Sequence, residues 1–158
     1  MKPWLKWSIV TVVVGSVAFV LTPLWPVPPT APQPPSALFP FFILLAFVES
    51  VSFGLGVAFL IFGRGLLGRL GRSPRLTTAA YLAVAFLLVN WWPHDNLHRM
   101  TSGDWARLVL VEYGFHLPLM VAGAVLAWFF ASLASPQSAR QLSASPPVKA
   151  AGLNEISG

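Results

Sequence analysis

Two histidines and an aspartate lie close together in the segment WWPHDNLHRMTSGDW, which begins at Trp91. His94 and His98 are spaced as i and i+4, so a helical turn opened by Pro93 would place both imidazoles on one face. Imidazoles at this spacing can share one metal ion, and Asp95 can ligate the ion or orient one of the rings. The alternative is a capped interfacial turn in which the histidines are hydrated and bind no metal.

The chain contains no cysteine, which excludes disulfides, thiolate metal sites and iron–sulfur clusters. Any metal site must therefore use histidine, carboxylate, methionine or backbone oxygen, and the His94, Asp95 and His98 set would suit copper, zinc or iron.

A second group of ionisable residues lies inside apolar segments. Glu49 and His116 each lie about halfway along such a segment, about 16 Å from its outer end. Glu112 precedes His116 by one helical turn, and Asn90 lies near the outer end of another apolar segment. A charge at the bilayer centre costs about 2.5–3.5 kcal/mol. These side chains are therefore expected either to surround a functional cavity or to hydrogen-bond two helices together.

The two groups also permit one continuous site. It would begin at His94 and His98, pass Glu112 and end at Glu49 and His116. Such a series of groups can relay protons or hold a carboxylate–histidine metal centre. Ligation of haem by two histidines would need a loop histidine in addition to His116, and a His/Glu pair near aromatic residues is also compatible with a quinone.

The composition identifies the chain as a membrane protein. Of its 158 residues, 56% are apolar and only 9% are charged, whereas a soluble domain is about 25% charged. So few charges cannot solvate a globular surface, and the apolar content excludes a disordered chain. The net charge of +5 is attributed to membrane topology and anionic lipid, and no nucleic-acid partner is expected.

Four apolar stretches are long enough to cross a bilayer as helices, which takes about 20 residues each. We therefore predict an all-α fold, a polytopic integral membrane protein in which residues 1–135 form a bundle of four transmembrane helices. Glycines such as Gly54, Gly56 and Gly123 are expected to permit close contacts between these helices. The expected helices span residues 4–24, 38–63, 77–92 and 105–133.

The segments outside these helices differ in kind. Residues 23–35 hold seven prolines and no charged residue, which predicts an extended strap. Residues 94–104 are expected to form a polar loop on the outer face. Residues 136–158 are rich in Ser, Pro and Ala and are expected to form a mobile cytoplasmic tail.

The basic residues predict the orientation, because Lys and Arg concentrate on the cytoplasmic side of membrane proteins. With both termini in the cytoplasm, only Arg99 and Arg107 of the ten Lys and Arg residues lie outside. The inner loop is expected to contact anionic lipid headgroups through four arginines, Arg64, Arg69, Arg72 and Arg75.

The first apolar stretch follows Lys2 and Lys6, a flank that it shares with signal peptides. Its length and the lack of a clear A-x-A cleavage site favour a retained helix.

Two functions fit this sequence best, and a third, a small transporter or channel, would require the four helices to oligomerise. We favour a non-catalytic accessory or assembly subunit of a larger membrane complex, because no P-loop, nucleophile elbow, dinucleotide fingerprint or H-E-x-x-H motif is present. The alternative is a membrane protein that binds copper, iron, zinc, haem or quinone at a His/carboxylate site open to the outer face. The expected partners are the lipid bilayer and other membrane subunits or further copies of this chain.

Overall fold

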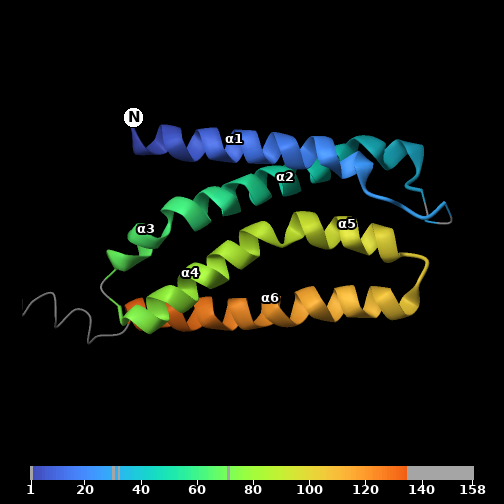
Figure 1. Cartoon of the computed structure of the whole chain (residues 1–158). Coiled ribbons are helices and arrows are strands. Elements are labelled where there is room, and N and C mark those ends of the chain that lie inside the picture. The colour runs from blue at the N-terminus through green and yellow to red at the C-terminus, as the bar shows by residue number, and fades with distance from the viewer. Residues whose placement is uncertain (1, 30, 32, 71, 135–158) are drawn as a thin grey trace, which may run out of the picture.

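The computed structural model describes residues 2–29, 31, 33–70 and 72–134, so the predicted tail of residues 136–158 lies outside the described part. No strand occurs among the described residues, and the all-α prediction is confirmed. The elements are α1 (Pro3–Leu21), η1 (Thr22–Leu24), η2 (Ser36–Leu38), α2 (Phe39–Phe62), α3 (Arg64–Gly68), α4 (Pro74–Val89), α5 (Trp91–Thr101) and α6 (Trp105–Ala134), as drawn in Figure 1.

Three helical segments of the described chain are long and apolar enough to cross a membrane, namely Pro3–Leu24, Ser36–Phe62 and Trp105–Ala134. The 16 residues of α4 extend for about 24 Å, which is less than the hydrocarbon core of about 30 Å. Taken together, α4 and α5 are long and apolar enough to cross a membrane as one span, which is bent by 48°. The described residues thus provide three helices that could span a membrane, or four if the bent pair is one span.

The segment of residues 94–104 is helical as far as Thr101, so the expected loop is in large part the helix α5. Pro93 explains why a new helix begins here. Proline lacks the N–H that would donate to the carbonyl of Val89, and its ring would clash with that carbonyl. As a result α4 ends at Val89 and α5 begins at Trp91. Pro93 then lies in the first turn of α5, where the backbone N–H groups have no partner within the helix, so its missing N–H is tolerated there.

A short turn at residues 102–104 reverses the chain between α5 and α6. The carboxylate of Asp104 accepts hydrogen bonds from the backbone N–H groups of Ala106 (3.1 Å) and Arg107 (3.2 Å), and it thereby caps the start of α6. The hydroxyl of Ser102 donates to the carbonyl of Arg99 (2.9 Å) at the end of α5. The two helices consequently run antiparallel beside each other (Figure 1).

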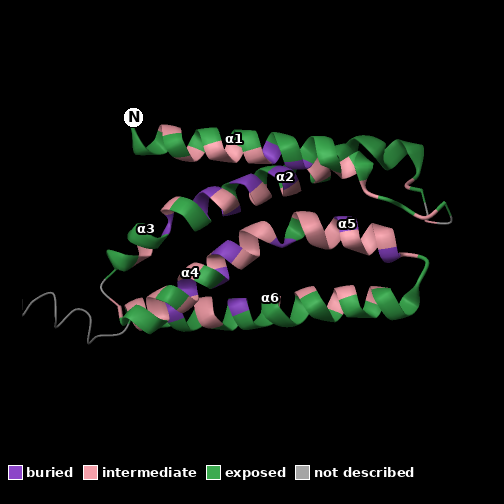
Figure 2. Ribbon diagram, in the orientation of Figure 1, coloured by how far each residue is buried: buried purple, intermediate pink, exposed green. Residues whose placement is uncertain are grey.

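The helices pack largely in chain order, with α1 on α2, α2 on both α4 and α5, and both of these on α6. Buried residues follow the contact faces of α1, α2 and α4 (Figure 2), whereas α1 and α6 expose most of their large apolar side chains. Such exposed apolar faces suit contact with lipid. Most of the buried residues in α1, α2 and α4 are small, namely Gly15, Ala18, Ser50, Gly54, Gly56, Ala58, Ala80, Ala83 and Ala85.

Glycine brings α1 and α2 close together. A Cβ atom at Gly54 would meet the backbone of Thr11 and Gly15 on α1, and a Cβ atom at Gly56 would meet side chains of α4. A Cβ atom at Gly123 would meet no atom within 4 Å in the described chain. The close contacts expected at Gly54 and Gly56 are therefore present, whereas Gly123 makes none with the described part of the chain.

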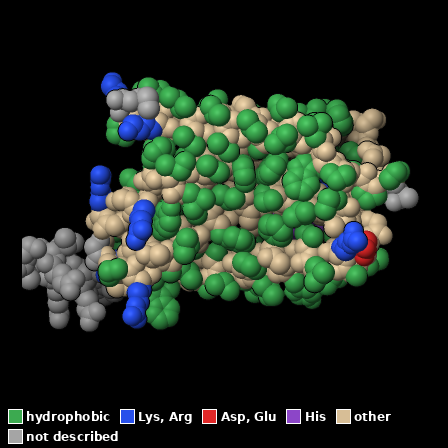
Figure 3. Space-filling model, in the orientation of Figure 1, with side chains coloured by type: hydrophobic (Ala, Val, Ile, Leu, Met, Phe, Trp, Pro, Cys, Tyr) green, Lys and Arg blue, Asp and Glu red, His purple; other side chains and the backbone are tan. Residues whose placement is uncertain are grey.

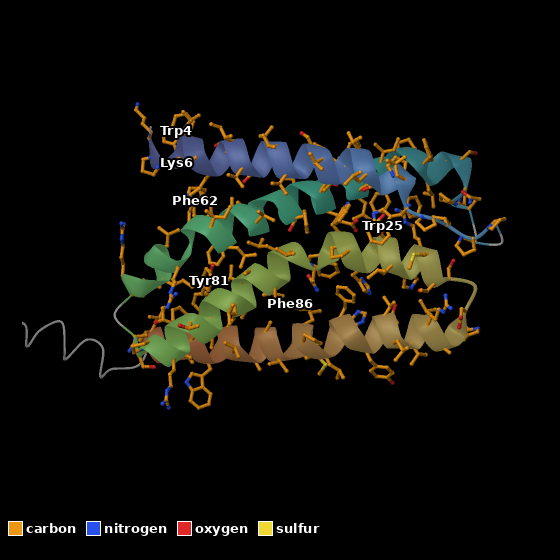
Figure 4. All side chains as sticks on the ribbon, in the orientation of Figure 1. Trp4, Lys6, Trp25, Phe62, Tyr81 and Phe86 are labelled. Carbon is orange, nitrogen blue, oxygen red and sulfur yellow. The ribbon has the colours of Figure 1, made fainter. Side chains whose placement is uncertain are left out.

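The two ends of the bundle differ in charge. Figure 3 shows several Lys and Arg side chains at the end that holds the N-terminus, while the acidic side chains visible in that view lie at the other end. Trp4 and Lys6 mark the first end and Trp25 the second in Figure 4. The ring of Trp25 lies 5.7 Å from that of Trp92, which links the proline-rich segment to α5. Aromatic residues at both ends are typical of membrane–water interfaces.

Replacing Gly54 by Ala is expected to destabilise the protein by about 1–3 kcal/mol, because the added methyl group would force α1 and α2 apart. Unfolding of the purified protein in mild detergent measures this effect. Gly123→Ala is the matched control and should leave the stability unchanged or slightly raised, since alanine favours the helix and meets no neighbour there. Equal stability of the two variants would contradict the close contact.

Candidate metal site between two helices

Two helical turns that face each other carry the ionisable side chains. α5 presents His94 and His98, and α6 presents Glu112 and His116, with i, i+4 spacing in both pairs. Residues at this spacing lie on one face of a helix. Because α5 and α6 are antiparallel neighbours, the four side chains meet, and we call them the His/Glu group.

The carboxylate of Glu112 lies at the centre of the His/Glu group. Its Oε1 is 3.2 Å from Nε2 of His98 and 3.9 Å from Nε2 of His94, and its Oε2 is 3.0 Å from Nδ1 of His116. The rings of His94 and His116 have centroids 5.1 Å apart and are almost perpendicular, with an interplanar angle of 87°. One carboxylate thus contacts two imidazoles and lies close to a third.

The hydrogen bonds of His116 determine which of its ring nitrogens carries a proton. Nδ1 lies 2.8 Å from the backbone carbonyl oxygen of Glu112 and 3.0 Å from the Oε2 atom of the same residue. A carbonyl oxygen only accepts, so Nδ1 donates, and Nε2 of the neutral ring keeps its lone pair. Histidines that bind metals commonly donate their second ring nitrogen to a carbonyl or carboxylate in this way.

His94 is the least exposed histidine of the group, with 16% of its side chain accessible. Its Nε2 is buried and has no hydrogen-bond partner within the described residues. A buried polar atom without a partner costs about 1–3 kcal/mol, so a ligand at this nitrogen would remove a penalty. The ring of Phe115, with its centroid 5.1 Å away, packs against the imidazole.

Three members of the group are placed to hold a metal ion. His94, Glu112 and His116 each offer one ligand atom, and these atoms lie within 4.8 Å of one another. A metal ion about 2.0–2.2 Å from each atom would draw the ligands slightly closer together. Two imidazoles and one carboxylate are the donors of His₂Glu zinc sites and of 2-His-1-carboxylate iron(II) sites.

The balance of charge in the group also favours a cation. The single carboxylate of Glu112 can neutralise only one positive charge. If all three imidazoles were protonated, they would repel one another at these short separations. Neutral imidazoles retain the lone pairs that metal ions need.

Asp95 and Glu49, which were expected in the site, lie outside the His/Glu group. Oδ2 of Asp95 is 3.4 Å from Nε of Arg99, one turn further along α5. Glu49 on α2 lies within electrostatic range of both Asp95 and Arg99. The structure thus joins the two expected histidines of α5 to the two expected residues of α6, and it places these two acids with Arg99.

Asn90 lies buried at the break between α4 and α5. Its backbone carbonyl accepts a hydrogen bond from the N–H of His94 (2.9 Å) and closes the first turn of α5. Its Oδ1 atom has no hydrogen-bond partner in the described chain. Asn90 therefore supports the His/Glu group through its backbone.

The four arginines expected at lipid headgroups lie along α3 and around the start of α4. Arg64 begins α3, and Arg75 lies in the first turn of α4. This end of α4 is remote from α5 (Figure 1), so the arginines and the His/Glu group lie in opposite halves of the bundle. Their contact with lipid stays a prediction.

Two residues near the site were not anticipated from the sequence. Phe115 packs on His94, and Arg99 pairs with Asp95. The i, i+4 spacing of Asp95 and Arg99 was the available signal for the second pair. No comparable signal marks Phe115, because an aromatic residue in an apolar helix is ordinary.

No protein family model, curated protein or solved structure matches this chain.

Replacing Glu112 by Leu is expected to destabilise the protein by about 1–3 kcal/mol, because the contact between its carboxylate and His98, which joins α6 to α5, would be lost. Thermal unfolding in detergent measures the effect. Tyr113→Leu is the control, since this neighbour on α6 is exposed and the substitution leaves the carboxylate in place. If both variants unfold at the same temperature, Glu112 does not tie the helices together.

Proposed function

We propose that this chain is an integral membrane protein that binds a divalent transition metal ion, zinc or iron(II), through His94, Glu112 and His116. The convergence of three ligand atoms within 4.8 Å carries the proposal. The buried Nε2 of His94, which has no hydrogen-bond partner in the described chain, and the Nδ1–H donation of His116 support it. His98, 3.2 Å from Glu112, orients the carboxylate.

Three protein ligands leave a coordination position open. A tetrahedral zinc ion would have one position for water or substrate, and an octahedral iron(II) ion would have several. The side chains of His98 and His116 are 44% and 48% exposed, which supports access to the site from outside the helix pair. A site that exchanges ligands is therefore favoured over a closed structural one.

The proposed topology has four spans, with α4 and α5 as one bent span and both termini in the cytoplasm. The Lys and Arg side chains at the N-terminal end of the bundle support this orientation (Figure 3). The His/Glu group would then lie in the half of the membrane nearer the outer face, and metal would reach it from that side.

An accessory or assembly subunit is the second candidate. The contact of Glu112 with His98 favours it, since it joins α5 to α6 without a metal. The His/Glu group would then be a structural link, and the exposed faces of α1 and α6 would meet lipid, other subunits or a second copy.

Metal titration distinguishes the two functions. Zn²⁺, iron(II) or Cu²⁺ is titrated into chelator-treated protein in mild detergent, and bound metal is counted by elemental analysis. We expect about one zinc or iron(II) ion per chain, with affinity lowered at least about tenfold by His94→Ala or His116→Ala. An absorption spectrum of the protein as purified tests for haem.

Asp95→Asn is the matched control, because Asp95 adjoins His94 on α5 but pairs with Arg99. It should leave the affinity unchanged, and Glu112→Gln should lower it. A metal site made of His94, Asp95 and His98 would give the reverse result. Folded protein that binds no metal would refute the proposal and favour the accessory subunit.

A further inference from the structure

A pocket of about 890 Å³ lies between the end of α1, the proline-rich segment, the start of α2 and α5. Pockets that bind small molecules have volumes of about 300–1,000 Å³ and mostly apolar walls. The apolar wall of this pocket includes Phe19, Phe39, Phe42 and Ala46. Its polar residues on α5 are Asp95, His98 and Arg99.

The charges at the polar wall do not favour an anion. Arg99 is paired with Asp95 at 3.4 Å, and its Nη2 donates to Oδ1 of Asn96 at 2.6 Å. Glu49 lies within electrostatic range of this pair and adds no positive charge. The single guanidinium of this wall is thus matched by the carboxylate of Asp95, and an anionic head group would find no excess positive charge.

The same wall offers both hydrogen-bond donors and hydrogen-bond acceptors. Arg99 supplies N–H donors, Asp95 supplies carboxylate acceptors, and His98 supplies a ring nitrogen. Nε2 of His98 is engaged with Glu112 at 3.2 Å, so Nδ1 remains for a molecule in the pocket. Oxygens that accept, such as carbonyls, and oxygens that donate, such as hydroxyls, both find partners here.

We propose that this pocket binds a neutral ring that bears carbonyl or hydroxyl oxygens and carries an apolar tail, the chemistry of a membrane quinone or quinol. The ring oxygens meet Asp95, His98 and Arg99, and the tail lies along the phenylalanines of α1 and α2. Aromatic and aliphatic walls match both the ring and the tail.

Contacts between separate elements hold the wall of the pocket in place. Nε1 of Trp92 on α5 donates to the hydroxyl of Thr22, a pocket residue in η1, at 2.9 Å. The ring of Trp92 also lies 4.9 Å from Phe53 of α2 and 5.7 Å from Trp25. The pocket is therefore formed before a ligand enters, which lowers the ordering cost of binding.

His98 belongs both to the pocket and to the His/Glu group, so a bound head group would lie beside the proposed metal site. Binding in the pocket does not depend on the metal. Each proposal can fail without the other.

Photolabelling tests the proposal on the full chain in mild detergent. An azido-quinone is cross-linked to the protein, and the labelled peptides are mapped by mass spectrometry. We expect saturable labelling of residues 19–46 or of α5, competed by a short-chain quinone and not by phosphatidylglycerol. Ala46→Phe, which fills the pocket, should reduce labelling at least about fivefold, whereas Ala124→Phe on the exposed side of α6 should not.

The double variant Asp95→Asn/Arg99→Gln removes both charges but keeps hydrogen-bonding groups, and it should leave quinone labelling within about twofold. Competition by phosphatidylglycerol instead of quinone would assign the pocket to anionic lipid and overturn the proposal. Equal labelling of Ala46→Phe and Ala124→Phe would also overturn it. If Ala46→Phe fails to fold, the competition of short-chain quinone and phosphatidylglycerol for labelling of the wild-type protein decides whether the pocket binds quinone.

Discussion

The carboxylate of Glu112 is the contact on which the arrangement of α5 and α6 depends. An acidic side chain in a largely apolar helix costs several kcal/mol in a membrane unless it is paired. Glu112 meets this requirement with His116 on its own helix and with His98 and His94 on the neighbouring one. The pairing fixes which faces of the two helices meet, because any rotation of α6 would return the carboxylate to lipid.

The break at Asn90 makes this pairing geometrically feasible. A straight continuation of α4 would carry the histidines along the axis of that helix, but the 48° bend redirects α5. After the bend α5 contacts both α2 and α6. His94 and His98 then face α6, while Asp95 and Arg99, on an adjacent face of α5, border the pocket shared with α2. A short helix with two polar stripes can in this way border two separate sites.

The helices themselves follow from local sequence. Long apolar runs must form helices in a bilayer, because a helix satisfies its backbone hydrogen bonds internally. For this reason the spans of residues 4–24, 38–63 and 105–133 were predictable to within a few residues. For residues 94–104 the sequence predicts a polar loop with a helical turn opened by Pro93, whereas the structure has a longer helix, α5, from Trp91 to Thr101. The contact at Gly54 and the free space at Gly123 likewise depend on helix rotation, which a single sequence does not reveal.

The sequence alone determined the all-helical class, the apolar stretches long enough to cross a membrane, the ionisable residues available for chemistry and their i, i+4 spacing. Only the tertiary structure decided how those residues combine. It joined His94 and His98 to Glu112 and His116, where the sequence allows either separate loop and intramembrane groups or one continuous site, and it placed Asp95 and Glu49 near Arg99. The physical reason is that spacing along a helix fixes which residues share a face, whereas the partner of that face depends on how separate helices bend and pack.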